Sequence, residues 1–334
     1  MIVKGIGATT EVDRHNCQIS KEALESSMRN ITEGEYAPSV GLNHDHSVMP
    51  IGKVIKGELV PFKENEYAAQ IHQDIFFDDF VKCIDNNGEA YYVGESKYDT
   101  RPFADTEKEN VTKLQIGVDP VNFENNEFQE IADFFEKECN ADSQPIMRKS
   151  LIPDPEIVFT LITGTLLFWT GKKTLDKLSD SIACDIAGCY SLIKKAIAKV
   201  VSFAVPKNRP ITYVFRESDS YVTELIIQTT DLNQVLEATK PENLSSVFDK
   251  IDQVSALISD SIAKIQFTYD CQNNKWEFNY LTSVTGQVLG TEKCYKRTAK
   301  VFEEIIKQSN AQASLAGTTN EQGDSKSCQN NPQQ

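Results

Sequence analysis

Residues 40–56 read V-G-L-N-H-D-H-S-V-M-P-I-G-K-V-I-K, a polar, titratable tip between two apolar runs that are typical of strands. The tip contains His44 and His46, two of only four histidines, with Asp45 between them. Pro50 belongs to the turn signal that follows. Loops carry reactive groups and strands hold them in place, so we expect this loop to line the functional surface.

The segments around this loop predict a β-rich N-terminal region with one early helix. Ser20 is a typical helix cap, and apolar residues recur at helical spacing from there to Gly34. Strands are expected at residues 2–7, 38–44, 51–60, 66–74, 90–94 and 111–118, and further helices at 75–84 and 127–139.

Length and composition predict a soluble globular protein with more than one domain. The 334 residues are 40% hydrophobic and 25% charged, with a formal net charge of -15. Residues 1–150 carry 28 Asp and Glu against 15 Lys and Arg, so most of the acidity lies in the first half. Such a surface repels phosphates, which argues against nucleic acid as a partner.

The pattern along the chain predicts an α+β fold in several parts. We expect a β-rich domain at residues 1–140, a proline-containing linker at 141–155, a helical hairpin at 156–207 and a ββαββα domain at 208–308. The tail at 309–334 is rich in Gln, Asn, Ser and Gly, so we expect it to be disordered.

The hairpin region has two interpretations. Its apolar run I-V-F-T-L-I-T-G-T-L-L-F-W at 157–169 is shorter than the ~20 residues that a membrane-spanning helix needs. The amphipathic residues that follow fit a helix that is buried in the protein, but residues 156–205 would also suit association with a membrane. The eight cysteines form no CxxC pair, and the N-terminus has no signal-like apolar run, so we expect a cytoplasmic protein.

The order of features in residues 2–118 resembles the phage prohead (capsid-maturation) serine proteases, relatives of the herpesvirus assemblin fold. The matching features are an opening strand, a helix beginning S-K-E-A-L, the dipeptide His44-Asp45, the motif P-I-G-K-V at 50–54, and a later strand ending in Ile116-Gly117. The resemblance covers about the first third of the chain and implies a barrel-like N-terminal domain.

The resemblance also implies catalytic roles, and at one catalytic position this sequence departs from the family pattern. His44 would be the general base beside Asp45, and the nucleophilic serine would stand where this chain has Gln115. A glutamine amide cannot form an acyl-enzyme, so either the domain is catalytically inactive or another serine serves. Ser96 and Ser47 are the candidates.

A metal site is a weaker alternative at the same loop. His44 and His46 alternate along the chain, so both would point to one side, and His72 or Asp74 would have to complete a zinc set. The sequence implies only two convergent ligands, and we expect hydrogen-bonded histidines, with no metal and no cofactor.

Three functions follow from these observations. The first is an inactive protease-fold protein, in a phage-related or defence role, that binds a protein or peptide partner. The second is an active self-processing serine endopeptidase that uses Ser96 or Ser47 with His44. The third is a membrane-associated effector or sensor.

Overall fold

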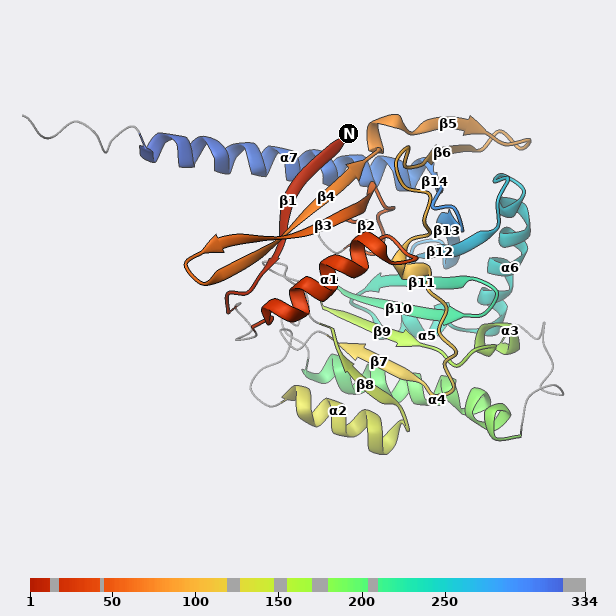
Figure 1. Ribbon diagram of the computed structural model, residues 1–334. Coiled ribbons are helices and arrows are strands. Elements are labelled where there is room, and N and C mark those ends of the chain that lie inside the picture. The colour runs from red at the N-terminus through yellow and green to blue at the C-terminus, as the bar shows by residue number, and fades with distance from the viewer. Residues whose placement is uncertain are drawn as a thin grey trace, which may run out of the picture.

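The fold is a mixed α+β arrangement of two open sheets surrounded by helices (Figure 1). The computed structural model describes residues 1–12, 18–42, 45–118, 127–146, 155–169, 180–203 and 210–320. Within these ranges neither sheet closes on itself, so the expected barrel-like domain is corrected to an open sheet. The N-terminal sheet has four strands, too few to curl around a core of their own.

The N-terminal sheet is antiparallel, with the strand order β1-β4-β3-β2. Its strands are β1 (Ile2–Thr9), β2 (Ser39–Val40), β3 (Gly52–Lys63) and β4 (Glu66–Ile75). Helix α1 (Lys21–Glu33) packs on one face through Leu24 and Met28. The Ser20 side chain accepts the Ala23 N–H and Gly34 ends the helix, as the sequence predicted.

The larger sheet has the strand order β5-β6-β14-β13-β12-β11-β10-β9-β7-β8. Its ten strands are β5 (Val81–Ile84), β6 (Ala90–Gly94), β7 (Gln115–Val118), β8 (Asp142–Pro145), β9 (Glu156–Thr160), β10 (Ile211–Ser218), β11 (Val222–Thr229), β12 (Ile262–Asp270), β13 (Lys275–Ser283) and β14 (Val288–Thr291). Strand β7 pairs with β8 and with β9, so the sheet continues across the expected linker at 141–155. Residues 147–154 of that linker lie outside the described residues.

Five helices pack around the main core on one face of the larger sheet. They are α2 (Glu127–Glu138), α3 (Thr165–Trp169), α4 (Asp180–Phe203), α5 (Leu232–Ala238) and α6 (Pro241–Ser255). Phe215, Leu225 and Phe267 of the central strands belong to this core. Figure 1 shows α2 and α4 below the sheet and α3 and α6 to its right.

The other face of the larger sheet meets the N-terminal region and helix α7 (Glu292–Asn320). A second apolar cluster joins Met49, Ile51 and Phe77 of the N-terminal region to Tyr280 of β13. Tyr295 of α7 stacks on Phe77, with ring centroids 5.1 Å apart. The loop that connects β2 and β3 therefore lies between the two sheets.

Two expected helical segments are strands in the structure. Residues 75–84 contain a short 3-10 turn (Phe77–Asp79) and strand β5, and Phe77 and Phe80 pack beside α7. Residues 156–160 form β9, parallel to β10, and not the start of a helical hairpin. A strand buried on both faces has a continuous apolar run, which periodicity alone cannot distinguish from a helix.

The C-terminal region follows the predicted order, with additions. Strands β10 to β13 and helices α6 and α7 occur in the order ββαββα, with α5 and β14 added. Helix α7 continues to Asn320, so the expectation of disorder from residue 309 is wrong for 309–320, where several alanines favour a helix. Residues 321–334 lie outside the described residues. In the described part of the chain, no helix has the length and apolarity to cross a membrane.

Candidate functional site

The tip of the loop between β2 and β3 is folded by its own side chains. The Asp45 carboxylate accepts hydrogen bonds from the Ser47 N–H at 2.8 Å and from the Ser47 hydroxyl at 2.7 Å. Aspartate favours this type of local turn. It engages the hydroxyl of Ser47, one of the two candidate nucleophiles. His44, the base that the resemblance implies, lies outside the described residues.

The backbone of the tip is hydrogen-bonded to elements that lie 220 to 250 positions later in the chain. The Gln266 amide of β12 donates to the His46 carbonyl at 2.8 Å. The Asn279 amide of β13 and the Arg297 guanidinium of α7 donate to the Ser47 carbonyl at 2.8 and 3.0 Å. Three side chains from two strands and a helix therefore hold two consecutive carbonyls of the loop.

The side chain of His46 lies beside a buried carboxylate. Its Nε2 atom is 3.2 Å from Oε1 of Glu156, the first residue of β9. The Glu156 side chain is 3% exposed and that of His46 is 33% exposed. The histidine with a buried acidic neighbour is therefore His46, and not His44 as the sequence suggested. The neighbour, Glu156, follows the expected linker at 141–155 in the chain, whereas His46 precedes it.

Next to this pair, a lysine joins two carboxylates. Lys264 Nζ lies 2.7 Å from Oε2 of Glu224 and 2.7 Å from Oδ2 of Asp105. Arg216 approaches Glu224 at 3.8 Å, and the Gln266 amide donates to Glu224 at 2.9 Å. These residues and the pair formed by His46 and Glu156 make up what we call the polar cluster: His46, Asp105, Glu156, Arg216, Glu224, Lys264 and Gln266.

The charges in the polar cluster stabilise one another. Burial alone would raise the pKa of Glu224, but the charges of Lys264, His46 and Arg216 outweigh burial and lower it to about 2. Burial lowers the pKa of Lys264, but Asp105 and Glu224 outweigh burial and raise it well above the usual range. Both groups are therefore charged at neutral pH, and their attraction joins the neighbouring strands β11 and β12 beneath the loop.

This arrangement suits anchoring better than catalysis. Glu224 and Lys264 are each 2% exposed, and their charged atoms contact other side chains of the cluster. A general base needs a lone pair that a substrate can reach, and a buried carboxylate bound to a lysine offers none. The polar cluster therefore holds the loop on β9 and β12, through the contact between Glu156 and His46 and the hydrogen bond from the Gln266 amide to the His46 carbonyl.

Ser96, the other candidate nucleophile, is buried at a different place, beside β4. Its hydroxyl donates to Asp74 at 2.6 Å and accepts the N–H groups of Tyr98 at 3.1 Å and Asp99 at 2.9 Å. A hydroxyl has one donor and two acceptor sites, so all three are used. In this state Ser96 closes a turn and has no lone pair for attack on a substrate.

Gln115 and the P-I-G-K-V motif also have described positions. Gln115 begins β7 and pairs with Thr160 of β9 and Asp142 of β8, inside the larger sheet. Lys53 of the motif is fully buried, and its ammonium donates to the carbonyls of Asp99 and Arg101. The motif therefore attaches β3 to the turn that Ser96 closes.

The other residues proposed for a zinc set are occupied elsewhere. His72 of β4 lies 3.4 Å from Glu58 of β3, and Asp74 accepts the Ser96 hydroxyl. His46 instead faces Glu156 of the larger sheet. Across the described ranges, no three His, Cys, Asp or Glu side chains converge in a metal-binding arrangement.

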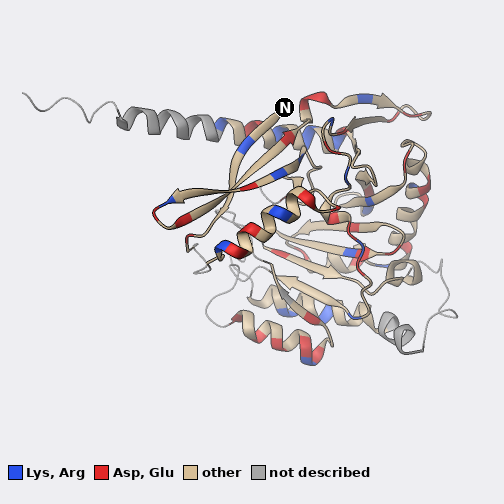
Figure 2. Cartoon of the chain, in the orientation of Figure 1, with Lys and Arg blue, Asp and Glu red and all other residues tan. Residues whose placement is uncertain are grey.

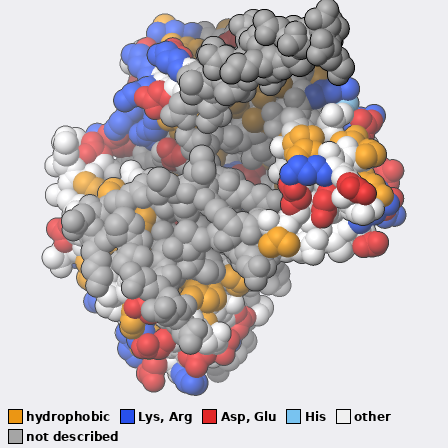
Figure 3. Space-filling model, turned by 90° about the vertical axis from the view of Figure 1, so that its left-hand side faces the viewer, with side chains coloured by type: hydrophobic (Ala, Val, Ile, Leu, Met, Phe, Trp, Pro, Cys, Tyr) orange, Lys and Arg blue, Asp and Glu red, His pale blue; other side chains and the backbone are white. Residues whose placement is uncertain are grey.

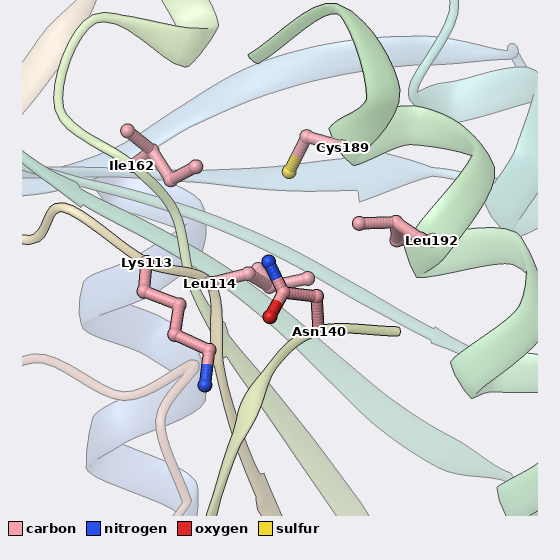
Figure 4. A pocket seen from close by; sticks show the side chains of 6 residues that line it. All are labelled: Lys113, Leu114, Asn140, Ile162, Cys189 and Leu192. Atoms are coloured by element: carbon pink, nitrogen blue, oxygen red, sulfur yellow. The ribbon is translucent and has the colours of Figure 1, made fainter. Parts of the chain in front are cut away.

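Two surface hollows lie outside the polar cluster. The first, of about 260 Å³, lies between β7 and α4 (Figure 4), and the labelled view shows Cys189 and Leu192 on the helix facing Leu114 and Asn140. The second, of about 430 Å³, lies at the β10–β11 turn and includes Glu217. The Glu217 carboxylate accepts the N–H groups of residues 164 and 166, so it is engaged in holding the start of α3.

Sequence reasoning identified the loop but missed its partners. Glu156, Glu224 and Lys264 lie in strands from three distant parts of the chain, so no local motif connects them. One feature of the sequence could have pointed to these partners: charged or amide residues at alternate positions of an otherwise apolar strand, such as Lys264 and Gln266. Such residues mark a strand face that meets a polar partner.

Comparison with known proteins finds no matching family model, no matching curated protein and no matching solved structure for this chain.

Proposed function

We propose that this chain is a protein-binding member of the prohead-protease-like class that has lost serine peptidase chemistry. The observation that carries the proposal is the state of its candidate nucleophiles. Gln115 stands at the expected serine position, and the hydroxyl of Ser96 makes three hydrogen bonds. The hydroxyl of Ser47 is bound to Asp45.

Binding fits the same features better than hydrolysis does. Loss of a nucleophile removes the acyl-enzyme route but leaves the surfaces that recognise an extended chain, because main-chain hydrogen bonds supply much of that affinity. The four-stranded sheet retains such a surface, since β1 lies at its edge.

A fluorophosphonate probe tests the loss of activity. The full chain is incubated with the probe beside an active serine hydrolase, and labelled peptides are located by mass spectrometry. We expect no serine of this chain to be labelled above the level in a heat-denatured sample.

Three variants make that result decisive. Ser96→Ala and Ser47→Ala remove the candidate nucleophiles, and His44→Ala removes the implied base. Labelling of one serine in the wild type that is lost in its own variant and in His44→Ala would overturn the proposal in favour of an active endopeptidase.

A further inference from the structure

The two sheets have four edge strands, and β1 differs from the other three. Strands β2, β5 and β8 have two, four and four residues, and β8 ends at Pro145, which has no N–H to donate. Strand β1 has eight residues and no proline. Natural sheets usually keep exposed edges short or interrupt them. The register of β1 shifts between Ile6 and Ala8 but is regular over positions 2–6, so this first part of the strand marks a place where another strand adds.

The backbone of β1 presents alternate residues outward. Met1 and Ile75 exchange both main-chain hydrogen bonds, at 2.6 and 2.8 Å. Because hydrogen-bonded pairs alternate along an antiparallel ladder, Val3 and Gly5 also bond to β4. The N–H and C=O groups of the residues between them, at positions 2, 4 and 6, therefore point away from β4, where no described strand pairs with them.

The side chains of this edge are apolar and exposed. Ile2 is 47% exposed, Val3 38% and Ile6 49%. In Figure 3, outside the atoms drawn in grey, hydrophobic side chains on the visible face form small groups among charged ones and no single broad patch. Exposed apolar residues along one strand fit a narrow, extended partner better than a flat protein surface.

Charge selects the kind of partner. Lys4 lies in the middle of the edge, and its ammonium has no hydrogen-bond or ion-pair partner among the described residues. Figure 2 shows this as the one basic stretch on β1, on a chain whose net charge is -15. A carboxylate directly opposite Lys4 would supply the missing partner.

A glycine next to this lysine leaves room for a large side chain. A Cβ atom added at Gly5 would meet nothing within 4 Å. A large residue opposite a glycine on the neighbouring strand covers the exposed backbone, and aromatic residues do so best. The edge thus favours an apolar residue opposite Ile2 and Ile6, an acidic one opposite Lys4 and an aromatic one opposite Gly5.

We propose that β1 is the docking edge for an extended, acidic and apolar segment of a partner protein, which adds to the four-stranded sheet as an antiparallel strand. This inference rests on the proposed function and assigns its binding surface. A second copy of the chain fits worse. If two copies of β1 paired antiparallel about a two-fold axis at Lys4, the two lysines would lie opposite each other. With the axis at Gly5 the two glycines would do so, and with the axis at Val3 each Ile2 would face a Lys4.

The test uses a labelled peptide, T-T-I-Y-E-V-I-T-T, whose antiparallel order sets Glu opposite Lys4 and Tyr opposite Gly5. Its matched control replaces the Glu by Lys. Binding to the full chain is measured by fluorescence anisotropy, and we expect the acidic peptide to bind at least about fivefold more tightly than the control. Lys4→Glu should reverse this preference.

Two further variants separate the edge from general effects. Lys4→Pro removes an outward N–H but no bond to β4, and it should weaken the acidic peptide about fivefold or more. Lys82→Glu makes the same charge change as Lys4→Glu on edge strand β5 and should have no effect. Circular dichroism confirms that each variant is folded.

Several outcomes would overturn the assignment. They are equal binding of both peptides, absence of binding, and an unchanged preference in Lys4→Glu. A further one is a dimer of the wild-type chain that dissociates in Lys4→Pro, because the occupant of the edge would then be a second copy. None of them bears on the lost peptidase chemistry, because fluorophosphonate labelling decides that point independently.

Discussion

Replacement of Lys264 by methionine should destabilise the protein strongly, because it leaves a buried carboxylate without its main partner. Lys264 lies 2.7 Å from Glu224, and each is 2% exposed. Removal of one partner from a buried ion pair costs about 3 to 5 kcal/mol. Lys264 is the largest of the charges that lower the pKa of Glu224, so its loss removes the main stabilisation of the ionised carboxylate.

The pH dependence of this loss distinguishes the ion pair from simple packing. Because the pKa of Glu224 is lowered on folding, its contribution in the wild type is complete above about pH 4.5 and is lost as the pH falls towards 2. In Lys264→Met the pKa of Glu224 should rise. The carboxyl then becomes neutral in weak acid, and the difference from the wild type shrinks there.

The measurement is urea unfolding of both proteins at neutral pH and in weak acid. Lys137→Met is the matched control, since Lys137 is 73% exposed and pairs with Asp133 on the surface, where such pairs contribute at most about 1 kcal/mol. The reasoning is refuted if Lys264→Met costs no more than Lys137→Met, or if its cost does not change with pH.

Two further predictions concern the turn that joins β3 to residues 96–101. Burial lowers the pKa of Lys53 to about 8, so between about pH 8 and 10.5 the unfolded lysine binds more protons and the Lys53 contribution to the free energy of unfolding should rise by up to about 3 kcal/mol. Urea titrations of the wild type and of Lys53→Met should show this rise as a change in the difference between the two proteins, because the buried thiols of Cys139 and Cys294, whose pKa values are raised, act equally in both. Ser96→Ala should cost about 1 to 3 kcal/mol, because it leaves two N–H groups without a partner and removes the hydrogen bond to Asp74. Ser27→Ala, on the exposed side of α1, should be nearly neutral in thermal unfolding.

Local signals predicted local structure in this chain. Helix α1 was predicted because Ser20 and Gly34 mark its two ends and apolar residues recur between them. Strand β9 was mistaken for a helix because its burial depends on β7 and β10, which are not adjacent to it in sequence. Contacts between residues far apart in the sequence also limit the prediction of the site. The loop could be identified from its histidines, but its partners could be identified only from the folded structure of the whole chain.

Hydrogen bonds from the larger sheet and from α7 give the loop a fixed position that apolar contacts alone would not. Apolar packing has no preferred direction, so the contacts of Met49 and Ile51 would tolerate a small displacement of the loop. Hydrogen bonds from Gln266, Asn279 and Arg297 to two neighbouring carbonyls allow only one position. The loop leads directly into β3, so the same bonds fix the four-stranded sheet on the larger one. We infer that the loop between β2 and β3 contributes to binding by fixing the position of the four-stranded sheet. The sheet then presents β1 as a rigid edge, where the partner is recognised.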